Sequence, residues 1–106
     1  MSTVYIAACP GDAARLEAVI RARLGDFKAI AEYAKSLGCL HRRFFASDEE
    51  IILVAEWQDI EVAVRKVWFL PETAAVLREA GVPPPHAWSN AVKPGHYRSI
   101  ADPTEF

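Results

Sequence analysis

Cysteine is scarce in this chain of 106 residues, because Cys9 and Cys39 are the only two and they form no CxxC pair. Such spacing predicts neither a disulfide framework nor a zinc site, and we expect two reduced, buried thiols in a cytoplasmic protein. The chain also lacks a run of about 18 apolar residues, so no transmembrane helix is expected. Its first residues, MSTVYIAACPGD, lack the basic start and long apolar core of a signal peptide.

An excess of charge of one sign is also missing, because 12 basic and 14 acidic residues leave a formal net charge of −2. This balance gives no field that would attract nucleic acid or an anionic membrane, so neither is expected as a partner. The histidines, His41, His86 and His96, form no close-spaced ligand pattern, and no metal site is predicted. Glycines are isolated and no nucleotide-binding fingerprint occurs, so no cofactor is expected.

Apolar residues, by contrast, are frequent and are arranged in strand and helix patterns. Short apolar runs bounded by turn residues predict strands, and apolar residues spaced three and four apart predict helices. The predicted strands are residues 3–9, 39–46, 51–57 and 86–92, and the predicted helical regions are 12–37, 59–70 and 71–80. The order is βαββαβ, which predicts an α+β, ferredoxin-like domain at residues 1–93, followed by a C-terminal tail at 94–106. Its antiparallel four-stranded sheet is expected to carry the helices on one face.

Local signals mark where the helices begin and end. Asp12 is a plausible N-cap for the first helical region. Gly25 and Asp26 interrupt the apolar stripe of that region, which leaves two alternatives: one kinked helix, or two helices on the same face of the sheet. Pro71 can serve as the first residue of the last helix, which Gly81 ends.

The strands carry apolar residues on both faces. In the first strand Val4, Ile6 and Ala8 point one way while Tyr5 and Ala7 point the other. A sheet that is covered by helices on one face should be polar on the other. The second face therefore requires cover, and a second copy of the chain is the economical answer. This pattern predicts a homodimer in which two sheets pack together as an α/β barrel.

The acidic turn at residues 47–50 predicts a hairpin and sets its register. If Ser47 faces Glu50, Arg42 lies opposite Ala55 on the helix-facing side, and Leu40 lies opposite Trp57. On the other face the same register places His41 opposite Glu56 and Arg43 diagonal to Glu56. These last three residues are predicted to form a structural charge cluster on the barrel-facing side.

Arg42 is therefore predicted to have apolar neighbours, which an unpaired charge tolerates poorly. Two alternatives remain: its side chain reaches solvent from the sheet edge, or it lines a pocket between helices and sheet. In the second case Phe44, Ala55, Trp57 and Trp68 would surround it. A guanidinium there would offer two parallel hydrogen bonds to a carboxylate.

Trp57, Trp68 and Trp88 have two interpretations, as core residues or as the aromatic wall of a cavity that stacks a flat ligand. An enzyme would in addition need a general base at the cavity. The candidates are Glu56, His86 and Tyr33.

Three short motifs suggest a family. Pro10-Gly11 ends the first strand, Gly38-Cys39-Leu40 opens the second, and residues 54–59 (VAEWQD) close the third. With the element order, they resemble the dimeric α/β-barrel superfamily and within it the antibiotic-biosynthesis-monooxygenase-like family, over residues 3–92. The resemblance implies a homodimer with a ligand cavity in each subunit between helices and sheet. Some members oxidise aromatic polyketides without a cofactor, and others degrade haem.

The haem-degrading members use an asparagine on the first strand, with a tryptophan and a histidine on the second helical region. Here the first strand has no asparagine, Lys66 stands near the tryptophan position, and Ala75 and Val76 stand near the histidine position. No haem degradation is therefore expected. The predicted function is binding or conversion of an apolar or aromatic carboxylate or phenolate. An enzyme of this kind would be a cofactor-independent monooxygenase or an isomerase-like catalyst, and a non-catalytic ligand-binding or interaction module is the alternative.

Overall fold

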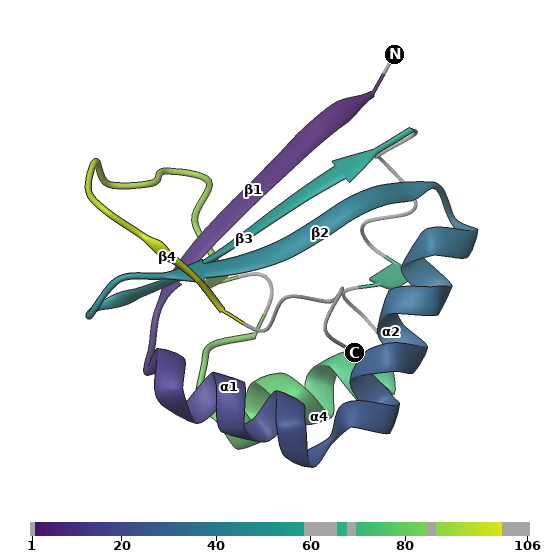
Figure 1. Ribbon diagram of the computed structural model, residues 1–106, viewed down its shortest axis with the longest axis horizontal. Coiled ribbons are helices and arrows are strands. Elements are labelled where there is room, and N and C mark those ends of the chain that lie inside the picture. Colours follow the sequence, from purple (N-terminus) through teal and green to yellow (C-terminus); the bar gives the residue numbers. More distant parts are fainter. Residues whose placement is uncertain (1, 59–65, 68–69, 85–86, 101–106) are drawn as a thin grey trace.

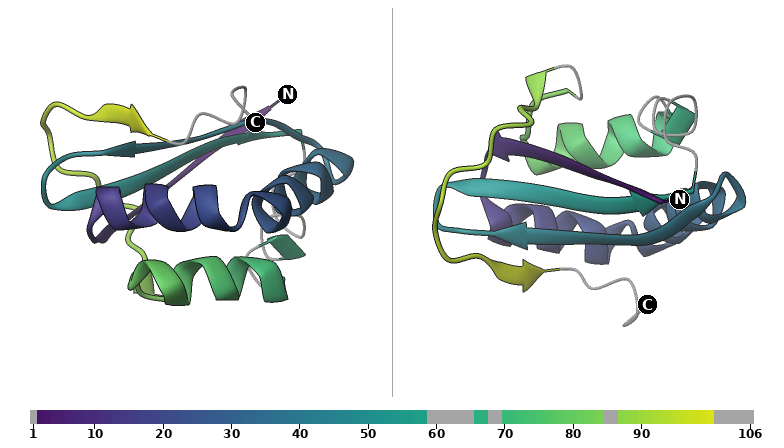
Figure 2. Two further views of the ribbon diagram at one scale, coloured as in Figure 1. Left: turned by 60° about the horizontal axis from the view of Figure 1, so that its bottom comes forward. Right: turned by 90° about the horizontal axis from the view of Figure 1, so that it is seen from above.

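The computed structural model describes residues 2–58, 66, 67, 70–84 and 87–100. These residues form an antiparallel four-stranded sheet with helices on one side of it, an α+β architecture compatible with a ferredoxin-like fold (Figures 1 and 2). The elements are β1 (Thr3–Pro10), α1 (Ala13–Ala22), α2 (Leu24–Ser36), β2 (Cys39–Ala46), β3 (Glu50–Trp57), α4 (Pro71–Ala80) and β4 (Arg98–Ile100). The predicted α+β class is confirmed. Most of the helix expected at 59–70 lies outside the described residues.

The fourth strand of the sheet is not the predicted one. Within the described residues 87–92, Ser89 makes only an isolated bridge to Ala8, with backbone hydrogen bonds of 2.7 and 2.8 Å. Side chains there bond backbone groups instead: Ser89 Oγ accepts from the amide of Ala91, and Asn90 donates to the carbonyl of Ile6 on β1. The first is a local hydrogen bond, of the kind that competes with a ladder. The expectation of a strand at 86–92 is therefore wrong for the described part.

The strand β4 comes instead from residues 98–100, for which the sequence predicted no element. It pairs with Phe44–Ala46 of β2, and the sheet order is β1-β3-β2-β4. The chain therefore passes around one end of the sheet, from the side of β1 to the side of β2 (Figure 2). Ile100 gives a physical reason, because its side chain is 4% exposed and joins the core. The C-terminal half of β2 is thus covered, where the sequence predicted a free edge.

The first helical region is two helices, one of the two alternatives, but the break lies two residues before Gly25. Arg23 ends α1 and begins α2, while Gly25 lies inside α2. The Arg23 guanidinium holds the break, since it bonds Asp26 and Glu79 at 2.6 Å each. Because Glu79 belongs to α4, this contact could not be found from local sequence.

The other predicted helix ends are confirmed. The Asp12 carboxylate accepts hydrogen bonds from the amides of Ala14 and Arg15, at 3.0 and 3.2 Å. Pro71 opens α4, and Gly81 closes it in the left-handed conformation with φ of 70°. A residue with a Cβ is strained at such a φ, so this position favours glycine.

The hairpin register is confirmed over most of its length. The Ser47 amide donates to the Glu50 carbonyl at 3.0 Å, and Arg42 pairs with Ala55. The expected pairing of Leu40 with Trp57 is wrong, because a bulge between Cys39 and His41 brings Cys39 opposite Trp57. The bulge buries Cys39 and leaves the Leu40 side chain 43% exposed.

Helices cover one face of the sheet, and the other face carries exposed apolar residues. The helices pack against one face and enclose the core (Figure 2). On β1, Val4 and Ile6 alternate with residues of the core face and remain 55% and 39% exposed. Both cysteines are buried and free. Within the described segments, no helix has the length and apolar character needed to cross a membrane.

Candidate functional site

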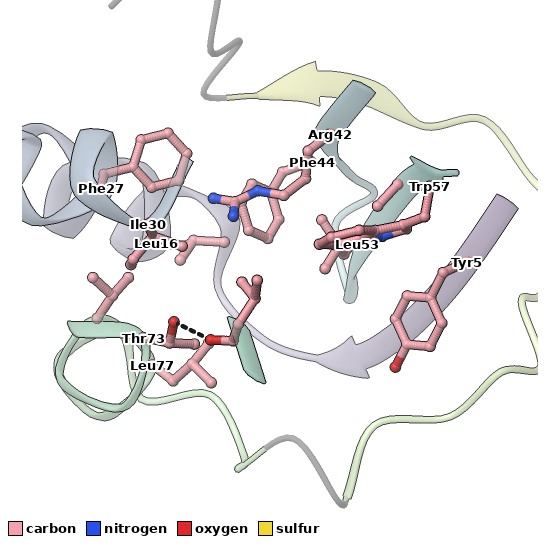
Figure 3. A pocket seen from close by; sticks show the side chains of 13 residues that line it. Tyr5, Leu16, Phe27, Ile30, Arg42, Phe44, Leu53, Trp57, Thr73 and Leu77 are labelled. Atoms are coloured by element: carbon pink, nitrogen blue, oxygen red, sulfur yellow. Dashed lines mark hydrogen bonds between the residues drawn. The ribbon is translucent and has the colours of Figure 1, made fainter. Parts of the chain in front are cut away.

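A cavity of about 50 Å³ lies between the helix layer and the sheet (Figure 3). Its walls come from the inner face of the sheet and from the apolar faces of the three helices. The apolar residues that line it are Leu16, Phe27, Ile30, Phe44, Leu53, Ala55, Val67, Val76 and Leu77. Four lining residues carry polar atoms: Tyr5, Arg42, Trp57 and Thr73.

The alternation of the strands brings the predicted site residues together. Arg42 and Phe44 of β2 face the same side as Ala55 and Trp57 of β3, and all four line the cavity. Side chains two residues apart on a strand share a face, so this grouping follows from the hairpin register. The small side chain of Ala55 lies directly across from Arg42 and leaves space beside it. Trp68, the fifth predicted member, lies outside the described residues.

The Arg42 side chain turns into the fold and does not reach out from the sheet edge (Figure 3). Its guanidinium carbon lies 5.2 Å from the centre of the Phe27 ring, a cation–π distance. Burial lowers the pKa of Arg42 well below its ordinary value, to about 10. The interpretation in which Arg42 lines a pocket is therefore the one that matches its position.

The described part of the chain gives Arg42 no negative partner. Neither a salt bridge nor a hydrogen bond joins its guanidinium to any described residue. Among those residues, the ionisable group that acts on it is the Cys39 thiol. Burial raises the pKa of Cys39, so this thiol carries no charge at neutral pH. Arg42 is thus a half-buried cation without a described partner of opposite charge.

Trp57, which lines the same cavity, carries a second donor. The Trp57 side chain is 2% exposed, and its Nε1 has no hydrogen-bond partner among the described residues. Trp88 shows the usual arrangement, because its Nε1 donates to the carbonyl of Pro83 at 2.9 Å. A buried donor without an acceptor costs about 1–3 kcal/mol, so such groups are rare in native proteins.

The remaining polar groups of the cavity offer no general base. Thr73 Oγ1 donates to the carbonyl of Val67 at 2.8 Å, as the dashed line in Figure 3 marks. Tyr5 reaches the cavity from β1. The described lining residues include no carboxylate and no histidine. The surface of the cavity is thus almost wholly apolar.

The three candidate bases do not gather at this cavity. Glu56 lies on the other face of the sheet, where its carboxylate accepts from Ser2 Oγ at 2.6 Å and lies 4.0 Å from His41 Nε2. Tyr33 is half-buried on α2 and is not a lining residue. His86 lies outside the described residues.

The expected charge cluster takes a looser form than predicted. His41, Arg43 and Glu56 do share the face opposite the helices, following the confirmed register. His41 meets Glu56 only at the 4.0 Å limit for an ion pair. Arg43 donates to Ser99 Oγ on β4 at 2.8 Å and lies 5.5 Å from the Phe45 ring centre. The unpredicted strand β4 thus supplies a partner that the sequence could not indicate.

Sequence reasoning missed the contribution of Phe27 to the site. Its ring centre lies 5.2 Å from the guanidinium carbon of Arg42 and 6.2 Å from the ring centre of Phe44. In the sequence Phe27 is one member of an apolar helical stripe, and nothing separates it from ordinary core residues. Thr73 had a weak signal, since it is a polar residue on the buried face of a helix.

No group of His, Cys, Asp or Glu side chains in the described segments could hold a metal ion. Comparison with family models, with curated proteins and with solved structures found no match for this chain. The fold and the cavity therefore carry the functional argument by themselves.

Proposed function

We propose that this protein binds a small monoanion with an apolar body, a carboxylate or phenolate, in the cavity between helices and sheet. The observation that carries the proposal is the pair of donors at this cavity. Arg42 and Trp57 both line it. The described residues offer no acceptor to the Trp57 indole N–H and no salt bridge to the Arg42 guanidinium. An anionic oxygen would supply the missing acceptor.

The chemistry of the two donors favours an anion over a neutral ligand. A guanidinium binds a carboxylate through two parallel hydrogen bonds, and charge-assisted bonds are about twice as strong as neutral ones. The apolar walls exclude water, which strengthens the attraction further. The rest of the ligand must be apolar, because a polar group among these walls would be buried without a partner.

We propose binding rather than conversion as the function of this site. Proton transfer needs a base within hydrogen-bond reach of the substrate. The described lining residues hold donors and no carboxylate or histidine, which supports a ligand-binding module. A cofactor-independent monooxygenase or an isomerase-like enzyme remains the alternative, and it would require a base from the residues beyond the described segments.

The test is a thermal-shift and calorimetric screen of sodium carboxylates and phenolates, each beside its neutral amide or methyl ether. At least one anion should raise the melting temperature, because a ligand that binds only the native state stabilises it by mass action. Arg42→Met should lose most of this shift, and Trp57→Phe should lose part of it. Arg43→Met is the matched control, since Arg43 lies on the opposite face and should leave the shift unchanged. An unaltered shift in Arg42→Met would refute the assignment.

The homodimer expected from the sequence is also a proposal. Its support is the outer face of the sheet, where Val4 and Ile6 are exposed on the strand that also builds the core. His41, Arg43 and Glu56 on that face carry both signs of charge, so two copies related by a two-fold axis can be complementary. Light scattering at micromolar concentration should give twice the mass of the chain. A folded monomer at that concentration would contradict the proposal, and with it the resemblance to dimeric α/β barrels.

A further inference from the structure

We infer that β4 is a strap that detaches from β2 while the rest of the fold stays intact, and that its detachment uncovers one wall of the cavity. This property does not depend on which ligand the cavity holds, so it goes beyond the proposed function. Three features of the structure support it: the row of buried side chains that β4 completes, the short attachment of β4, and the exposed chain that leads to it.

One row of buried side chains crosses the inner face of the sheet and ends at β4. The strand pairing brings Ala7, Leu53, Phe44 and Ile100 into register, one from each strand. All four are buried, and all belong to the core cluster. Leu53 and Phe44, in the middle of the row, also line the cavity. Directly opposed side chains on one face of a sheet lie within contact distance, so Ile100 covers Phe44 from the edge of the sheet. Without Ile100, Phe44 and the cavity wall behind it would be open to solvent.

The attachment of β4 to the sheet is short. The strand has three residues and lies at the edge of the sheet, where it pairs with β2. Arg98 and Ser99 are exposed, and Ile100 alone among the three is buried. The hydrogen bond from Arg43 to Ser99 Oγ lies on the exposed outer face, where water competes for both groups. Segments with few buried apolar contacts open locally while the rest of a protein stays folded.

The chain that leads to β4 does not hold it in place. Residues 90–96 are exposed, and Tyr97 is half-buried (Figure 2). The Tyr97 hydroxyl donates to the Lys93 carbonyl at 2.7 Å, a bond within this same segment. Before the segment, the backbone of Ser89 is bonded to Ala8 of β1. The strap can therefore leave β2 while the chain remains fastened to β1, and the exposed segment between them gives up little burial.

Hydrogen exchange of the intact chain, followed by NMR, tests whether β4 opens by itself. Ile100→Ala removes the buried anchor and should speed exchange of the β4 amides at least about tenfold, because truncating a buried isoleucine is strongly destabilising. Asp12→Ala is the matched control, since it removes the cap of α1 and leaves β4 untouched. It should speed exchange of the central β3 amides about fivefold through global unfolding and leave the β4 amides unchanged. Ile100→Val is the milder variant if Ile100→Ala does not fold.

A reporter thiol in the cavity wall tests whether the opening reaches the cavity. Leu53→Cys places a thiol one strand behind Phe44, and Ala55→Cys is a second reporter on the same strand. Iodoacetamide should modify the reporter without urea, at a rate that Ile100→Ala raises at least about tenfold and Asp12→Ala leaves unchanged. The native thiol of Cys9 is the internal control, because it is buried on β1 and should stay unmodified under the same conditions. Peptide mass spectrometry distinguishes the sites.

The two measurements can each overturn part of the inference. If Asp12→Ala speeds exchange of β4 and β3 by the same factor, β4 opens only with the whole domain and is not a strap. If β4 opens by itself but Ile100→Ala leaves modification of both reporters unchanged, its opening does not uncover the cavity wall. Neither result bears on the anion proposed to bind at Arg42, which the ligand screen tests separately.

Discussion

Replacing Arg42 by methionine should make the unliganded protein more stable. Burial lowers the pKa of Arg42 well below its ordinary value, to about 10. At about 1.4 kcal/mol for each pKa unit, the charged form costs the native state about 3 kcal/mol. Methionine keeps the length and apolar character of the stem and removes the charge. Against this gain stands the lost contact with Phe27, since a cation–π interaction contributes about 0.5–2 kcal/mol.

The net expectation for Arg42→Met is a rise of about 1–2 kcal/mol in the free energy of unfolding. For a domain near 100 residues, each kcal/mol raises the melting temperature by roughly 4–8 °C. Urea denaturation followed by circular dichroism measures the free energy, and scanning calorimetry measures the temperature. Arg43→Met is the control, because that residue bonds Ser99 on the opposite face and should lose less than about 1.5 kcal/mol.

The pH dependence provides a second readout with a definite sign. Because the native pKa of Arg42 lies below its unfolded value, the unfolded chain holds more protons between about pH 10 and 12.5. The free energy of unfolding of the native sequence should therefore rise across that window relative to Arg42→Met. The difference in free energy of unfolding between Arg42→Met and the native sequence should therefore be smaller above about pH 10 than at pH 7. If Arg42→Met loses more than about 1 kcal/mol at pH 7, Arg42 has a structural partner and the reasoning is refuted.

Four further outcomes test other parts of the structure. Asp12→Ala should lower the free energy of unfolding by about 1 kcal/mol in urea, because two amides lose their cap. Gly81→Ala should destabilise by about 1–2 kcal/mol in the same assay, since its φ is 70° and a Cβ would lie 2.6 Å from the Arg15 guanidinium. Burial raises the pKa of Cys9 to about 12, so iodoacetamide at pH 8 should modify Cys9 only in urea, as peptide mass spectrometry can show. Ile6→Lys should give a folded monomer in light scattering if the outer sheet face is the dimer interface.

The parts of the fold that could be predicted are those with local causes. Asp12 caps α1 because its carboxylate reaches amides two and three residues ahead. Gly81 ends α4 because the left-handed conformation belongs to a single residue. The hairpin register follows from the turn at 47–50, and a few residues of sequence carry that information. Each signal lies within about four residues of its effect.

The parts that could not be predicted depend on residues far apart in the chain. The break at Arg23 is held by Glu79, and the strand β4 exists because its residues find the C-terminal half of β2. Residues 98–100 are too few to show an alternating pattern. The bulge at Cys39 has no signal either, although it decides which of Cys39 and Leu40 is buried.

The candidate site combines both kinds of cause. The register that brings Arg42 opposite Ala55 is local, so the sequence could place the residue on the helix-facing side. The position of its side chain depends on Phe27 of α2, whose ring lies beside the guanidinium only in the folded chain. The sequence therefore left two alternatives for Arg42, and tertiary contacts distinguish them.

Placing the charge of Arg42 among apolar side chains lowers the stability of the unliganded protein, and this favours a role in binding a ligand. A hydrophobic residue of similar length would fill the same space beside Phe27 and Ala55 without the penalty of a buried charge. Within the described residues, the Arg42 guanidinium makes one cation–π contact, with Phe27. The indole N–H of Trp57 makes no hydrogen bond there. Neither the Arg42 guanidinium nor the Trp57 indole N–H has an acceptor among the described residues, although both residues line one cavity. An anion bound as proposed would supply an acceptor, and its binding would offset free energy that folding loses at this site.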